Sequence, residues 1–391
     1  MPTNLPAEAK KKWNQAIQAR NPKEKLRLLQ EFLGLIPKHK GTSKLCAQTK
    51  RQIATLRKEI AEKEQRRAGK GGPKFFLQKE GAAQIVILGE TKVGRSSLLT
   101  AVTNAKAEIS DYPYTTREPI PGMLSYKDIQ FQIVEAPALV EGAAEGRAWG
   151  LQTLGLARNA DGLILMVDLS QNPENQLSLI LNELEKARIV VQKPKGEVQI
   201  QRLHMAVGLS IFVLGRLTDC SLNDVKEMLK SYGIVNAIVK IFGEVSLDDV
   251  EDAIFESTNY RPAIIVANKL DVAGATEKLE TLKKFVDGKI KIFPVSCKNG
   301  FGLKNLGAEI FDALEIIRVY TKSPSDKAPS PKPFILKRGA TVSDLAKQIH
   351  SDFLNRFSHA KVWAERLSFS PQKVGLSFVL EDGDIIELHA K

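Results

Sequence analysis

The chain is poor in cysteine and has no hydrophobic run long enough to cross a bilayer. Its 391 residues include three cysteines, Cys46, Cys220 and Cys297, which lie far apart without paired spacing. This pattern argues against a disulfide framework or a zinc site and fits a reducing cytosol. The start lacks a signal-peptide core, and the longest apolar stretch, residues 205–215, is too short for a membrane span. We therefore expect a soluble cytoplasmic protein with no membrane partner.

Acidic residues are scarce near the amino terminus. The whole chain carries a net charge of +12, and twenty Lys and Arg stand against seven Asp and Glu before residue 81. The excess thus belongs to an arm, and the rest is close to neutral. Such an arm usually contacts RNA, DNA or another polyanion, although a merely solvated helical face is the alternative. We expect residues 1–81 to form a basic helical region, with helices over 7–19 and 22–35.

Buried strands alternate with helices from residue 82 to residue 320, which is typical of a parallel sheet covered on both faces. Strands are predicted over residues 84–88, 129–135, 162–168, 263–267 and 290–295. Residues 190–260 interrupt the alternation and predict a small α+β insertion. Four prolines in residues 321–333 indicate an extended linker, and residues 334–391 form a compact binding module without a visible catalytic constellation.

A glycine loop follows the first of these strands and opens into a helical pattern. Its spacing is that of a Walker A loop, in which backbone N–H groups surround phosphate oxygens at a positive helix end. Arg95 stands where the phosphate-binding lysine is expected. The predicted phosphate-binding residues are Gly89, Glu90, Thr91, Lys92, Val93, Gly94, Arg95, Ser96 and Ser97.

Base recognition is indicated by two motifs at the ends of later strands. Asn268, Lys269 and Asp271 form an N-K-x-D element, whose carboxylate accepts two N–H bonds from guanine. Adenine lacks that pair of donors and would leave the carboxylate unsatisfied, which is costly. In a following S-C-K element, a backbone N–H could meet the guanine carbonyl oxygen and the lysine could cover the ring. Its residues are Ser296, Cys297 and Lys298.

Magnesium ligands are predicted at three positions. Ser96 and Thr116 would offer hydroxyl groups, and Glu135 would hold the ion through a water molecule. Glu135-Ala136-Pro137-Ala138 stands where a G protein normally has D-x-x-G. The extra methylene of Glu135 shifts its carboxylate by about 1.5 Å, and Ala138 cannot adopt the positive φ of glycine without strain. A decayed switch is the alternative interpretation of this segment.

Together these motifs resemble the developmentally regulated GTP-binding (DRG) family within the Obg-like GTPases of the translation-factor class. The likeness extends to residues 40–45, 112–116, 140–144 and 317–322, to the insertion ahead of Asn268, and to a tail that looks like a TGS domain, a ubiquitin-like β-grasp. It implies a P-loop GTPase domain with GTP or GDP and magnesium, and potassium-assisted GTP hydrolysis without a catalytic glutamine. Leu139 stands at the position of that glutamine. The resemblance also implies association with ribosomes or RNA, here through the basic hairpin and the TGS domain, and leaves open an accessory regulatory protein.

Three functions remain open at this stage. The first is a slow GTPase whose catalytic residues are Lys92, Arg95 and Thr116. The second is a guanine-nucleotide-binding adaptor that does not hydrolyse GTP, which the replacements Arg95, Glu135 and Ala138 favour. The third is an RNA-binding scaffold without a nucleotide, which the intact base motif argues against. Lys92 occupies the position where relatives place a potassium ligand, and its ammonium group is predicted to replace the missing lysine or the potassium ion.

Overall fold

The structure, a computed structural model, describes residues 6–18, 22–36, 45–46, 48–54, 56–57, 77–105, 118–203, 208–254, 259–324, 328–350, 354 and 356–390. The chain divides into two compact units, Met1–Lys74 with Lys193–Asn259 and Phe75–Gln192 with Tyr260–Lys391. No helix within the described ranges is long and apolar enough to span a membrane. All three cysteines are free of disulfides.

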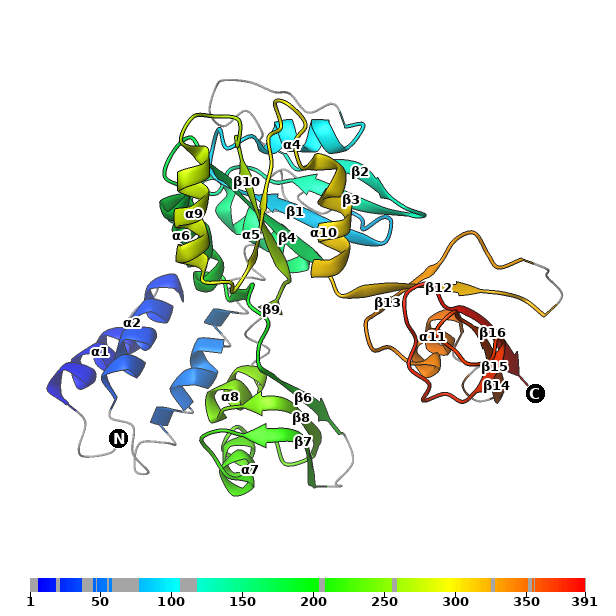
Figure 1. Ribbon diagram of the computed structural model, residues 1–391. Coiled ribbons are helices and arrows are strands. Elements are labelled where there is room, and N and C mark those ends of the chain that lie inside the picture. The colour runs from blue at the N-terminus through cyan, green and yellow to red at the C-terminus, as the bar shows by residue number, and fades with distance from the viewer. Residues whose placement is uncertain are drawn as a thin grey trace. The chain divides into compact units, whose positions relative to one another are not determined.

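A six-stranded sheet forms the centre of the larger unit (Figure 1). Its strands lie in the order β11-β10-β4-β1-β3-β2, and every pair is parallel except β2 with β3. The five strands predicted from the sequence are confirmed to within one residue at each end, whereas the edge strand β2 was not predicted. The bounds are β1 (Ala83–Leu88), β2 (Ile120–Tyr126), β3 (Ile129–Glu135), β4 (Gly162–Asp168), β10 (Ala263–Asn268) and β11 (Lys291–Pro294).

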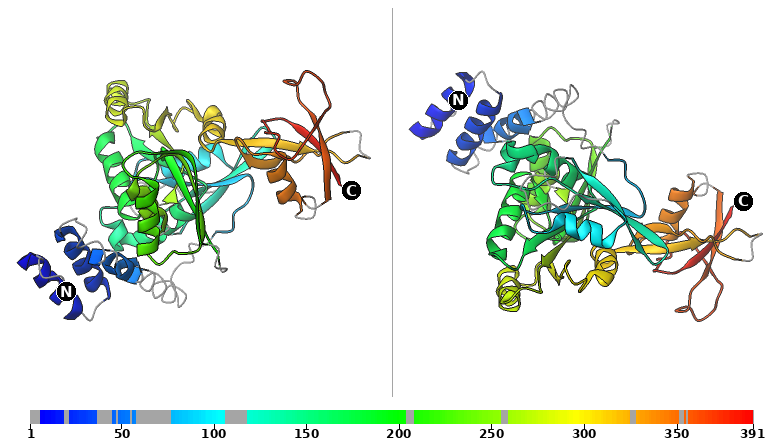
Figure 2. Two further views of the ribbon diagram at one scale, coloured as in Figure 1. Left: turned by 90° about the horizontal axis from the view of Figure 1, so that it is seen from below. Right: turned by 90° about the horizontal axis from the view of Figure 1, so that it is seen from above.

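Helices cover both faces of this sheet, as the two views of Figure 2 also show. One face packs on α5 (Gly150–Asn159), α6 (Pro173–Lys186) and α9 (Ala275–Val286), and the other on α4 (Arg95–Val102) and α10 (Leu306–Ala313). Because both faces are buried, the central strands β1, β4 and β10 are almost continuously apolar. Short 3-10 turns are η1 (Ala143–Glu145), η2 (Arg147–Trp149) and η3 (Leu303–Asn305).

The carboxyl-terminal module is a five-stranded sheet with α11 (Val342–Ile349) against one face. Thr341 and Asp344 form a capping box at the start of α11. β12 pairs with both β13 and β16, so the module begins upstream of residue 334, where the sequence placed its start. The prolines of residues 321–333 connect two strands of one sheet. The strands are β12 (Ile316–Thr321), β13 (Phe334–Lys337), β14 (Phe357–Trp363), β15 (Gln372–Val374) and β16 (Ile385–Ala390).

The smaller unit joins amino-terminal helices with the predicted α+β insertion. Helices α1 (Ala7–Gln18) and α2 (Pro22–Leu35) pack together with helical residues 48–54 around Ala16, Leu29 and Ile53. The insertion is a three-stranded sheet whose buried face packs on two helices. Its elements are β6 (Gly196–Arg202), β7 (Leu209–Leu217), α7 (Leu222–Ser231), β8 (Ala237–Val245) and α8 (Leu247–Ile254). The short strands β5 (Ile189–Val190) and β9 (Asn259–Tyr260) flank it in the sequence.

Candidate functional site

The predicted phosphate loop connects the end of β1 with the start of α4. Lys92 and Gly94 both have positive φ angles, 64° and 98°. A Cβ on Gly94 would lie 2.4 Å from Nδ2 of Asn268, and one on Gly89 would lie 2.9 Å from the carbonyl oxygen of Met166. Both glycines are therefore needed for the close approach of the loop to its neighbours. The Lys92 side chain is exposed, and partial burial raises the pKa of Glu90.

Asn268 ties the phosphate loop to the predicted base-binding loop. Its Nδ2 donates to the carbonyl oxygen of Val93 at 2.9 Å, and its Oδ1 accepts the backbone N–H of Cys297 at 3.1 Å. The side chain is 2% exposed. One buried amide thus satisfies polar backbone groups from two loops that are far apart in the sequence. The structure brings the glycine loop, the N-K-x-D element and the S-C-K element into one site.

Asp271 is held for base recognition by a neighbouring hydroxyl. Ser296 Oγ donates to Asp271 Oδ1 at 2.5 Å. This bond, together with the charges of Lys298 and Lys269, lowers the pKa of Asp271. The carboxylate is therefore ionised near neutral pH and retains a second oxygen that can accept N–H donors. Burial next to this anion raises the pKa of Cys297 to about 11, so its thiol stays protonated.

Asp168 is a site residue that the sequence did not reveal. It is fully buried at the end of β4, directly beside Asn268 on β10. Its Oδ2 accepts Lys269 Nζ at 2.5 Å, and its Oδ1 accepts both the N–H and the hydroxyl of Ser170. Lys269 has a positive φ of 66°. Asp168 could have been found from the sequence, because it is an aspartate at the end of an otherwise apolar predicted strand.

Arg95 points toward the end of β3. Its side chain is buried, with 8% of the residue exposed, and its Nη1 donates to the carbonyl oxygen of Ala136. Burial lowers the pKa of Arg95, and the nearby Glu135 carboxylate partly offsets this shift. The guanidinium nevertheless remains charged, because its intrinsic pKa is so high. Arg95, which stands at the position expected for the phosphate-binding lysine, is thus engaged with the protein backbone.

Two oxygen donors suited to magnesium lie together at this end of the site. Ser96 Oγ donates to Glu135 Oε1 at 2.6 Å, which joins the first turn of α4 to the end of β3. Hydroxyl and carboxylate oxygens are the ligands that magnesium prefers, so these residues fit the ion. The third predicted ligand, Thr116, lies outside the described residues, as do residues 112–115 of the same motif.

The segment after Glu135 is fixed without backbone strain. Ala138 does not adopt a positive φ, which removes the strain expected of an alanine at this position. The N–H of Leu139 donates to the carbonyl oxygen of Gly89 at 3.0 Å, and the Leu139 side chain is fully buried. Further on, the Glu183 carboxylate accepts N–H groups of Gly142 and Ala144 at 3.0 and 2.7 Å.

Family models match most of the chain. A model described as a 50S ribosome-binding GTPase matches residues 84–194, one for the C-terminal region of that GTPase domain matches residues 206–316, and a TGS domain model matches residues 317–390. The human developmentally-regulated GTP-binding protein 2 is 30% identical over 368 residues, which are 94% of this chain and 99% of the relative. This chain belongs to the DRG family.

Two further relatives align over the same share of this chain. A protein of Methanocaldococcus jannaschii named an uncharacterized GTP-binding protein is 33% identical, with 94% of this chain and 93% of the relative covered. Ribosome-interacting GTPase 1 of Saccharomyces cerevisiae is 29% identical, with 94% and 99% covered. The solved structure of the Schizosaccharomyces pombe YchF GTPase aligns with a TM-score of 0.44 and 16% identity over 80% of this chain and all of that one.

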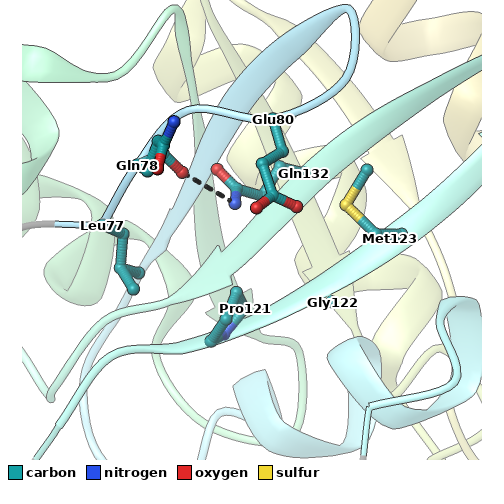
Figure 3. A pocket seen from close by; sticks show the side chains of 7 residues that line it. All are labelled: Leu77, Gln78, Glu80, Pro121, Gly122, Met123 and Gln132. Carbon is teal, nitrogen blue, oxygen red and sulfur yellow. Dashed lines mark hydrogen bonds between the residues drawn. The ribbon is translucent and has the colours of Figure 1, made fainter.

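A hollow of about 230 Å³ lies beside β2 in this DRG-family chain (Figure 3). Gln132 Nε2 donates to the carbonyl oxygen of Gln78 at its wall, at 3.1 Å. None of the predicted site residues lines it. The lining residues are Leu77, Gln78, Glu80, Pro121, Gly122, Met123 and Gln132.

Proposed function

We propose that the protein binds GTP and GDP through the Asn268-centred site and hydrolyses GTP slowly. The observation that carries this proposal is the Asn268 amide, which joins the phosphate loop to the loop of Cys297 beside the ionised Asp271. In this proposal Asp271 accepts the two guanine N–H donors, and a backbone N–H of residues 296–298 meets the guanine carbonyl oxygen. Family membership supports the same assignment.

The residues of the phosphate end take complementary roles in this proposal. The loop from Gly89 to Ser97 surrounds the phosphates, and the exposed Lys92 places its ammonium near the β- and γ-phosphates. Ser96, Thr116 and Glu135 would hold magnesium, which neutralises phosphate charge when bound. A water molecule attacks the γ-phosphorus, the bond to the bridging oxygen breaks, and GDP and phosphate leave. Positioning and charge neutralisation supply most of the rate.

The proposal is tested by binding and by product release. Purified protein is titrated with GTP, GDP and ATP, and single-turnover phosphate release is then measured with magnesium in potassium or sodium buffer. We expect the protein to bind GTP and GDP much more tightly than ATP. Phosphate release should be slow, and its rate should be the same in potassium and in sodium. Equal affinity for ATP would refute base recognition by Asp271. Tight GTP binding without phosphate release would instead identify a non-hydrolysing adaptor.

Lys92 can be tested separately with a matched control. Lys92→Ala should weaken GTP binding at least about tenfold, as the loss of a charged contact of 1.4 kcal/mol or more implies. Lys284→Ala removes another exposed lysine, from α9, and should leave binding unchanged. A strong potassium requirement in the wild-type protein would contradict the role given to Lys92.

We further propose that the protein associates with ribosomes or structured RNA through its basic amino-terminal helices and its TGS domain. The cluster of twenty basic residues before residue 81 supports this, as does the name of the yeast relative. Phosphate contacts of this kind weaken steeply with salt. The double variant Lys11→Gln/Arg27→Gln, on exposed positions of α1 and α2, should flatten the salt dependence of binding. An unchanged slope would remove these helices from the interface.

A further inference from the structure

Three hydrogen bonds connect the carboxyl end of β3, and the residues that follow it, to the phosphate loop. Ser96 Oγ bonds to Glu135, the Arg95 guanidinium bonds to the carbonyl oxygen of Ala136, and the N–H of Leu139 bonds to the carbonyl oxygen of Gly89. The Ala136 and Leu139 residues are fully buried. This short segment, residues 135–139, contains the predicted magnesium residue and the backbone predicted to face the γ-phosphate.

The Arg95 guanidinium lies in the protein interior and bonds to the protein itself. Its residue is 8% exposed, and the Glu135 carboxylate provides a counter-charge close to it. The Ala136 carbonyl that it satisfies belongs to a fully buried residue, and an unsatisfied buried carbonyl is costly. A guanidinium is longer than an ammonium group and presents several donors in a rigid plane, so a lysine would not reproduce this contact. Lys92, by contrast, is exposed on the same loop.

We propose that Arg95 is a positioning residue that holds segment 135–139 against the phosphate loop, and that it is not a phosphate ligand. The inference rests on the proposed nucleotide binding, because that segment flanks the γ-phosphate end of the same site. In this proposal the Lys92 ammonium group neutralises the phosphate charge. The two cations of this unusual loop have separate tasks, one inside the protein and one facing the nucleotide.

The two roles predict opposite responses in nucleotide-free and nucleotide-bound protein. Arg95→Met should lower the melting temperature of the nucleotide-free protein by about 2–6 °C, since a buried carbonyl loses its donor. The same variant should change the affinities for GTP and GDP by less than about threefold, while single-turnover phosphate release slows by tenfold or more. Lys92→Ala should do the reverse, with an unchanged nucleotide-free melting temperature and at least tenfold weaker GTP binding.

Arg95→Lys provides the sharpest comparison, because it restores the lysine of a standard phosphate loop and keeps the charge. We expect this variant to melt below the wild-type protein without nucleotide, to gain no affinity for GTP, and to release phosphate more slowly. If Arg95→Met does not fold, Arg95→Lys alone decides between the two roles. Tighter GTP binding by Arg95→Lys would overturn the proposal.

The remaining outcomes separate this inference from the proposed function. A nucleotide-free melting temperature that is unchanged in both Arg95 variants would also overturn it, and so would a tenfold loss of GTP affinity in Arg95→Met with an unchanged phosphate-release rate at saturation. If the wild-type protein binds no guanosine nucleotide, the proposed function fails. The nucleotide-free melting comparison still decides whether Arg95 holds the segment.

Discussion

Arg318 on β12 is the residue whose replacement should most clearly loosen the larger unit. The residue is 8% exposed, and its Nε and Nη2 donate to Asp382 at 3.1 and 2.8 Å. Its Nη1 donates to Asp128 at 2.5 Å, in the turn between β2 and β3. One guanidinium therefore links the carboxyl-terminal sheet to a hairpin of the nucleotide-binding sheet. We predict that Arg318→Met destabilises the protein substantially.

The size of the effect follows from what the two carboxylates retain. Asp382 Oδ1 still accepts the Arg318 backbone N–H at 2.7 Å, and Asp128 still accepts the Tyr320 hydroxyl. Both carboxylates are also partly exposed, at 32% and 28% of their side chains, so water can reach them. The loss should therefore fall below the 3–5 kcal/mol typical of a broken buried ion pair, at about 2–3 kcal/mol. In a unit of this size that corresponds to roughly 4–12 °C in melting temperature.

Thermal and urea unfolding of the full chain measure this loss. Arg338→Met, which removes an exposed arginine just after β13, is the matched control and should change stability by less than about 0.5 kcal/mol. Arg318→Lys should recover only part of the loss, because one ammonium group cannot bridge both carboxylates. If Arg318→Met has the same melting temperature as the wild-type protein, the three side-chain bonds contribute no net stability and the reasoning is refuted.

Three further predictions concern charge and protonation. Asp271→Asn should shift base preference from guanine toward xanthine, because an amide can donate to the xanthine carbonyl; unchanged GTP affinity in calorimetry would contradict it. Cys297, whose pKa is raised to about 11, should react slowly with iodoacetamide at pH 8 and faster near pH 11. Burial alone would raise the pKa of Asp382 and Asp128, but their bonds lower it. Their stabilisation is complete above pH of about 4 and lost as pH falls through the lowered values, so Arg318→Met should lose less stability in acid than the wild-type protein.

Local patterns in the sequence were sufficient to predict the sheet that positions the site. Most of the predicted strands are short runs of apolar residues bounded by polar or turn residues, and such runs are recognisable because both sheet faces are buried. Asn268 and Asp271 were identified because their chemistry depends on spacing within one loop. The capping box of Thr341 and Asp344 is likewise a contact between residues three positions apart.

Contacts between residues far apart in the chain could not be predicted from the sequence. Lys269 and Asp168 are 101 positions apart, and Arg95 and Ala136 are 41 positions apart, so no local period connects them. The edge strand β2 is interrupted by Pro121 and Gly122, which weaken a strand pattern, and pairing with β3 overrides that local preference. β12 was assigned to the nucleotide-binding domain because its partners β13 and β16 follow it in the chain.

The replacements at Arg95 and Glu135 are physically coupled, so reverting them singly should not restore a standard GTPase site. Arg95 bonds to the carbonyl oxygen next to Glu135, and Ser96, the residue after Arg95, bonds to Glu135 itself. Glu135→Asp shortens the side chain by about 1.5 Å, which breaks the 2.6 Å contact with Ser96 while Arg95 still holds the backbone in place. Neighbours of this kind deviate from additivity by about 0.5–3 kcal/mol. A double-mutant cycle of Arg95→Lys and Glu135→Asp in urea unfolding should show that coupling, whereas additive losses would mean that the two replacements arose as independent features of the site.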